Sequence, residues 1–151
     1  MPLKNYTSTV PAARSITYIE SCLTRSGARQ IMKSYDNDGR TEAISFSIPL
    51  NGNDIFFKLP AKVEACTQVL LNDLSPRAKP DTRKKIPEQA ERTAWKICSD
   101  WIEAQMAMVE LAQVDVLEVF LPYMYDPKSD KTFYESAKAK GVAGFLPAPK
   151  G

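Results

Sequence analysis

A long amphipathic pattern between Glu88 and Tyr125 constrains the fold of this chain more than any other stretch. It contains both tryptophans and three of the five methionines. At about 100° per residue, its apolar and charged side chains separate onto opposite arcs of a helix, so we expect one face to be buried. The apolar arc consists of Ala90, Ala94, Ile97, Cys98, Trp101, Ile102, Met108, Val109 and Ala112. The charged arc consists of Glu88, Arg92, Lys96, Asp100, Glu103 and Glu110.

Three segments before this helix carry the signals of antiparallel strands. Apolar and polar residues alternate from Glu42 to Leu50, which is the period of a strand with one buried face. Asn51-Gly52 favours a hairpin turn into Asp54 to Leu59, and the DNDG turn at 36–39 follows a candidate strand from Arg29 to Tyr35. The side chains predicted to face the core are Ile44, Phe46, Ile48, Leu50, Ile55, Phe57 and Leu59.

Helical patterns flank these strands. Ser15 can cap a helix that runs to Ser26, with Gly27 as its C-terminal stop. A second helix is predicted from Ala61 to Leu74, with Pro60 in its first turn. Further predictions are a short helix capped by Asp115, with Glu118 at its third position and Pro122 at its end, a possible strand from Thr132 to Tyr134, and either an edge strand or an arm from Lys4 to Val10.

These elements predict an α+β fold, in which an αβββα unit with a three-stranded antiparallel sheet is followed by the long amphipathic helix and a short C-terminal helix. A chain of 151 residues that is 44% hydrophobic suits a single domain over 1–151. Its parts are the αβββα unit at 1–74, a basic, proline-rich connection at 75–87, the helical part at 88–125 and a C-terminal extension at 126–151.

The residue types that are missing exclude the common enzyme designs. The chain has no histidine, which removes the usual general base, zinc ligand and partner of a serine or cysteine nucleophile. Its three cysteines form no CxxC pair, so a zinc site or a disulfide framework is not expected. We therefore predict a non-enzymatic protein with no catalytic residues, no metal and no cofactor.

No signal peptide and no apolar run of about 20 residues is present, which indicates a cytoplasmic protein without a membrane span.

Charge is distributed unevenly along the chain. Residues 1–87 hold 13 of the 20 Lys and Arg residues but 8 of the 18 Asp and Glu residues. The connection at 75–87 is the densest basic segment, and it is either a solvated loop or a contact for phosphates or an acidic partner. Its basic residues are Arg77, Lys79, Arg83, Lys84 and Lys85.

Phe56 has two interpretations. It points away from the predicted core beside Lys58, as an aromatic that stacks on a nucleobase would. Alternatively, the long helix covers it with Trp95 or Trp101, which is the interpretation that we favour. A nucleic-acid surface would consist of Arg29, Lys33, Phe56, Lys58 and the five basic residues of the connection.

A contact between copies of the chain is the second candidate surface. Tyrosine and methionine are favoured at protein interfaces. We therefore expect a homo-oligomer that associates through Trp101, Phe120, Tyr123 and Met124.

Several stretches resemble a family of small, uncharacterised phage and prophage proteins. They are SGARQIMKSYDNDGRTEAISFSI, FFKLPAKVEA, AERTAWKICSDWIEAQMAMVE, VDVLEVFLPYM and KTFYE. The similarity as a whole covers most of the chain, from about Ile16 to Glu135. The resemblance implies a phage origin and a location in the host-cell cytoplasm, and it brings no assigned activity. The order of elements is also similar to that of phage single-strand annealing proteins.

Two functional hypotheses follow. The first is a nucleic-acid-binding protein that is accessory to phage DNA replication or recombination, which predicts salt-sensitive binding. The alternative is an inhibitor of a host defence system, which binds a host protein or sequesters a nucleotide signal.

Overall fold

The computed structural model describes residues 2–111 and 115–145 and has the predicted α+β architecture. Helix α1 (Ala12–Arg25) precedes the strands β1 (Gln30–Tyr35), β2 (Thr41–Leu50) and β3 (Asn53–Pro60). The helices α2 (Val63–Asn72), α3 (Pro80–Lys84) and α4 (Ile86–Glu110) follow. The remaining elements are α5 (Val116–Phe120), η1 (Leu121–Tyr123), β4 (Tyr125–Asp126), β5 (Lys131–Thr132), α6 (Phe133–Lys140) and η2 (Val142–Phe145).

The three long strands form an antiparallel sheet in the order β1-β2-β3, as the alternating pattern predicts. Asn51 and Gly52 have φ angles of 51° and 82°, which suit the turn of a two-residue hairpin. Ile31, Phe46 and Phe57 are cross-strand partners, so their side chains lie on the same face. This inner face carries the large buried apolar residues of the sheet.

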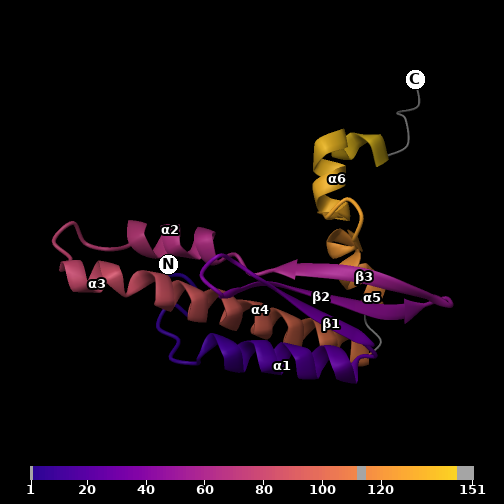
Figure 1. Ribbon diagram of the computed structural model, residues 1–151, viewed down its shortest axis with the longest axis horizontal. Coiled ribbons are helices and arrows are strands. Elements are labelled where there is room, and N and C mark those ends of the chain that lie inside the picture. The colour runs from indigo at the N-terminus through magenta and orange to yellow at the C-terminus, as the bar shows by residue number, and fades with distance from the viewer. Residues whose placement is uncertain (1, 112–114, 146–151) are drawn as a thin grey trace.

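Helices α1 and α4 pack side by side against the inner face, and α2 packs on α4 (Figure 1). Trp95 of α4 is fully buried, and its Nε1–H donates a hydrogen bond of 3.2 Å to the carbonyl oxygen of Thr41. A smaller apolar cluster lies between α2 and the first turns of α4. The buried residues of the main core are Ile16, Ile19, Cys22, Leu23, Ile44, Phe46, Ile48, Phe57, Leu59, Trp95, Ile102 and Phe120.

The buried residues of α4 differ from the predicted apolar arc, because the helix has contacts on two sides. Trp95, Thr93 and Ser99 are buried although the predicted arc omits them, whereas Met108 on that arc is exposed. The sheet and α1 contact one side of α4, and α2 contacts another. The buried surface is therefore broader near the start of the helix than one amphipathic stripe. Ala112 lies outside the described residues.

Several predicted boundaries need correction. Helix α1 begins at Ala12, so Ser15 lies within the helix rather than at its N-cap, and its side chain is buried. Pro60 ends β3 instead of starting α2. The predicted connection at 75–87 contains α3 and the start of α4, because Pro80 and Pro87 occupy first-turn positions, where proline is tolerated.

The terminal segments also differ in part from the predictions. The segment 4–10 contains turns and no strand, which leaves the interpretation as an arm. Of the predicted strand from Thr132 to Tyr134, only Thr132 belongs to β5, because its side chain and that of Glu135 form a capping box that starts α6. Two other signals are confirmed: Asp115 caps α5 by accepting a hydrogen bond from the Leu117 N–H, and Gly27 has a positive φ after α1.

Within residues 2–111 and 115–145, no helix has the length and apolar character needed to cross a membrane.

Candidate nucleic-acid interface

The residues predicted to bind nucleic acid are divided among different parts of the molecule. Phe56 and Lys58 lie on the outer face of the sheet, which is the face opposite α1 and α4. Lys33 pairs with Ile44 across the strands and therefore lies on the inner side. The basic residues of the connection surround α3, at the end of the long axis opposite the β2–β3 hairpin (Figure 1).

Lys33 and Arg29 have different surroundings at the edge of the sheet. The Lys33 ammonium lies 3.0 Å from the Glu20 carboxylate of α1, and this hydrogen bond raises the pKa of Lys33. Lys33 is thus engaged in an ion pair within the fold. Arg29 is exposed, and its backbone N–H donates to the carbonyl oxygen of Ser47.

Phe56 does not lie beneath the long helix. It pairs with Ser47 on β2, and Ser47 pairs with Gln30 on β1, so these three side chains form one row on the outer face. The preferred interpretation, in which Trp95 or Trp101 covers Phe56, is therefore wrong. The helices cover the inner face instead, where the buried apolar side chains of the sheet lie.

The outer face is concave along its central strand. Ser45 and Ser47 of β2 are small, whereas their neighbours Met32 and Phe56 on the flanking strands are large. Tyr125 and Pro127, from the β4–β5 hairpin, add a wall. The result is a hollow of about 430 Å³, the outer-face hollow, which is lined by Gln30, Ile31, Met32, Ser45, Phe46, Ser47, Phe56, Tyr125 and Pro127.

A polar cluster lies beside this hollow. The Tyr125 hydroxyl donates a hydrogen bond of 2.8 Å to the Asp130 carboxylate, and the Lys58 ammonium lies 3.2 Å from the same oxygen. Lys58 also lies 5.3 Å from the centre of the Tyr125 ring, within the range of a cation–π interaction. The Tyr125 hydroxyl and then Lys58 lower the pKa of Asp130. Together these contacts fix the Tyr125 ring against β3.

The basic residues around α3 form the second surface, which we call the basic end. Arg83 and Lys84 belong to the last turn of α3, and Lys85 connects α3 to α4. Cations are favoured at the C-terminal end of a helix. All members of the basic end are exposed, and no carboxylate lies within 4.0 Å of them in the part of the chain that the structure describes. The members are Arg77, Lys79, Arg83, Lys84 and Lys85.

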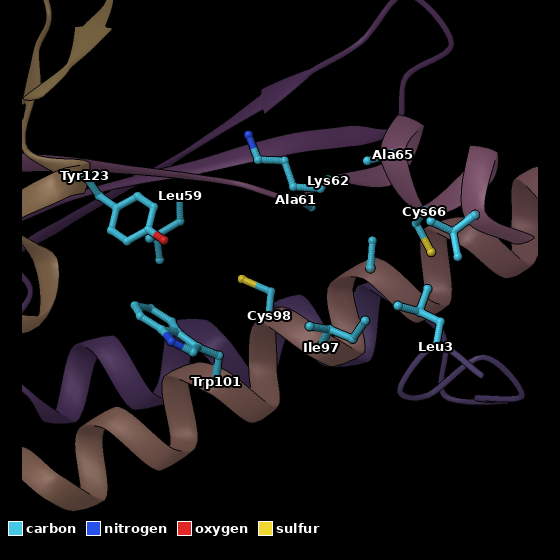
Figure 2. Close-up of a pocket in the computed structure, with 12 residues that line it drawn as sticks. Leu3, Leu59, Ala61, Lys62, Ala65, Cys66, Ile97, Cys98, Trp101 and Tyr123 are labelled. Carbon is cyan, nitrogen blue, oxygen red and sulfur yellow. The ribbon is translucent and has the colours of Figure 1, made fainter. Parts of the chain in front are cut away.

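A third feature is an apolar hollow of about 340 Å³ between α2, α4 and the end of β3 (Figure 2). Trp101 and Tyr123 flank one end, and Leu3 and Cys66 lie at the other. The thiol of Cys98 is directed into this space (Figure 2). Burial raises the pKa of the Cys98 thiol to about 11, so the thiol is protonated and weakly nucleophilic near neutral pH.

The predicted contact between copies of the chain includes residues of the core. Phe120 has no exposed surface, and its ring centre lies 5.9 Å from that of Trp101 in an edge-to-face contact. Phe120 therefore has no surface to offer a second copy in this fold. Tyr123 and Met124 are half-buried, and self-association through them stays a prediction.

Ser47 and Tyr125 are missing from the predicted site. Ser47 is part of an alternating strand, where a serine is typical of a solvated face. Tyr125 lines the same hollow as Phe56 because the neighbouring Met124 forms a bridge with Phe57. No local sequence pattern indicates that long-range bridge. The sequence signal for Tyr125 is its position directly before the turn DPKSD at 126–130, which holds two aspartates.

No group of three or more Cys, Asp or Glu side chains in the described ranges is arranged to hold a metal ion. Comparison with protein-family models, curated proteins and solved structures finds no match. The resemblance to phage proteins therefore stays a prediction.

Proposed function

We propose that this protein binds nucleic acid without catalysing a reaction, and that it is a phage-encoded accessory to DNA replication or recombination. The observation that supports this function is the basic end, whose five cations are exposed and lack carboxylate partners within the described residues. Elsewhere Lys4, Lys33, Arg40, Lys58 and Lys96 are neutralised by carboxylates. Other cations, such as Arg14, Lys138 and Lys140, also lack carboxylate partners among the described residues, but the basic end gathers five of them within positions 77–85.

Unpaired cations held by a helix suit a phosphate backbone. Each Lys or Arg that neutralises a phosphate releases condensed counterions, and this release supplies much of the affinity at low salt. Since α3 fixes Arg83 and Lys84 at a helix end, less conformational freedom is lost on binding than in a solvated loop. A surface of this kind does not depend on base sequence.

The alternative, an inhibitor of a host defence system, is favoured by the apolar hollow of Figure 2. Its lining is mainly aliphatic and aromatic, which is typical of sites that receive an apolar group of a partner. Its basic residue is Lys62. The hollow thus supports binding to one particular protein or small molecule.

Purification from host cells at about 50 mM salt separates these functions. We expect copurified nucleic acid, measured by extraction and ultraviolet absorbance, that leaves the protein as the salt concentration rises to about 200 mM. A stoichiometric host protein, or a small nucleotide that survives high salt while no nucleic acid is bound, would contradict the proposed function and support the alternative.

A further inference from the structure

The outer-face hollow contains a buried hydroxyl without a partner. Ser47 has no exposed surface, and its Oγ makes no hydrogen bond within the described residues. Ser47 nevertheless lines the outer-face hollow. Buried hydroxyl groups normally have a hydrogen-bond partner. A ligand in the hollow can supply one to Ser47 once the side chains that cover its oxygen move aside.

The walls of the hollow suit a flat ring. Phe56 and Tyr125 line it with aromatic surfaces, and Met32, which is 59% exposed, borders it on β1. The hydrogen bond that the Tyr125 hydroxyl donates to Asp130 and the cation–π contact with Lys58 hold the Tyr125 ring in place. A ring that stacks on these side chains therefore meets surfaces that are already ordered.

We propose that the outer-face hollow binds an unpaired nucleobase, an inference that rests on the proposed nucleic-acid binding. The base stacks on Phe56 and Tyr125, and an edge group forms a hydrogen bond with the Ser47 hydroxyl, which can donate or accept. A base in a duplex is stacked on both faces and cannot enter. The hollow thus makes the protein prefer single strands, whereas the basic end contacts the phosphates of any strand.

A nucleobase fits better than an apolar side chain of a protein partner. An apolar side chain would fill the same volume but would leave the Ser47 hydroxyl unpaired. Lys58 lies beside the hollow, where its partner Asp130 is 70% exposed, so a phosphate attached to the bound nucleoside can compete for this cation. A charge beside a stacking surface is the usual arrangement in proteins that bind single strands.

The test compares two single strands of about 20 nucleotides, whose phosphates span about 70 Å at about 3.4 Å each. One strand carries all its bases, and the other has the same sugar-phosphate backbone with abasic positions. We expect the wild-type protein to bind the intact strand about tenfold more tightly, measured by fluorescence anisotropy, because stacking on aromatics stabilises each base. This comparison needs no variant that could fail to fold.

Variants of the protein show which residues cause the preference for the intact strand over the abasic strand. Phe56→Leu keeps apolar volume but removes the flat ring, and it should abolish the preference for the intact strand without weakening the abasic one. Tyr6→Leu, the matched control, removes an exposed aromatic ring from the N-terminal segment, outside the hollow, and should retain the preference. Ser47→Ala should weaken only the intact strand, by about threefold.

The binding measurements distinguish a failure of the nucleobase site from a failure of nucleic-acid binding as a whole. Equal binding of both strands would overturn the nucleobase site and leave phosphate binding in place. Absence of binding to either strand would overturn both proposals. A preference for the intact strand that persists in Phe56→Leu would overturn the assignment of the base to this hollow.

Discussion

Replacing Trp95 by alanine is expected to lower the free energy of unfolding by about 3 to 5 kcal/mol. The indole is fully buried where α4 meets the sheet, so its removal leaves a cavity that neighbouring side chains fill only in part. The carbonyl oxygen of Thr41 also loses its hydrogen bond from Nε1. Domains of this size have a total stability of about 5 to 15 kcal/mol, and urea denaturation measures how much of it remains.

Trp101→Ala provides the comparison, because this indole is half-buried and borders the apolar hollow. It is expected to cost less than Trp95→Ala. A loss of under about 0.5 kcal/mol for Trp95→Ala would contradict the described packing of α4, since surface substitutions usually change stability by no more than that.

Replacing Arg83, Lys84 and Lys85 together by alanine is expected to weaken binding to a single-stranded oligonucleotide by about 100-fold at 0.1 M salt. Each phosphate contact on a single strand adds about 0.7 to the slope of log affinity against log salt concentration. Three lost contacts therefore reduce the slope by about 2. Fluorescence anisotropy over a series of salt concentrations measures both changes.

The matched control replaces Arg14, Lys138 and Lys140, which are also one arginine and two lysines, exposed and without carboxylate partners among the described residues. The two triple variants have the same net charge. If both weaken binding equally, the effect is one of total charge, and the basic end is not the binding surface. Thermal unfolding should be nearly unchanged in both, since these side chains are exposed.

The sheet could be predicted because its signals are local. Alternation over β2 and the Asn51-Gly52 turn specify strand, face and register together. The short helices could not be predicted in the same way. The segment around Pro80 is typical of a loop, yet proline also suits the first turn of α3. At Thr132, the capping box with Glu135 prevails over the strand preference of the aromatic residues that follow.

The candidate site was predictable only in part. That Phe56 and Lys58 lie on the face opposite the core follows from strand periodicity alone. Which element covers that face does not, because it depends on the bridge between Phe57 and Met124. For the same reason, the burial of Ser47 and the contribution of Tyr125 are properties of the tertiary fold.

The salt dependence of wild-type binding to single-stranded DNA tests the central claim most directly. If all five cations of the basic end contact phosphates, log affinity should fall against log salt concentration with a slope of about −3.5. No binding at about 50 mM salt, or an affinity that stays constant up to about 200 mM, would contradict nucleic-acid binding through this surface.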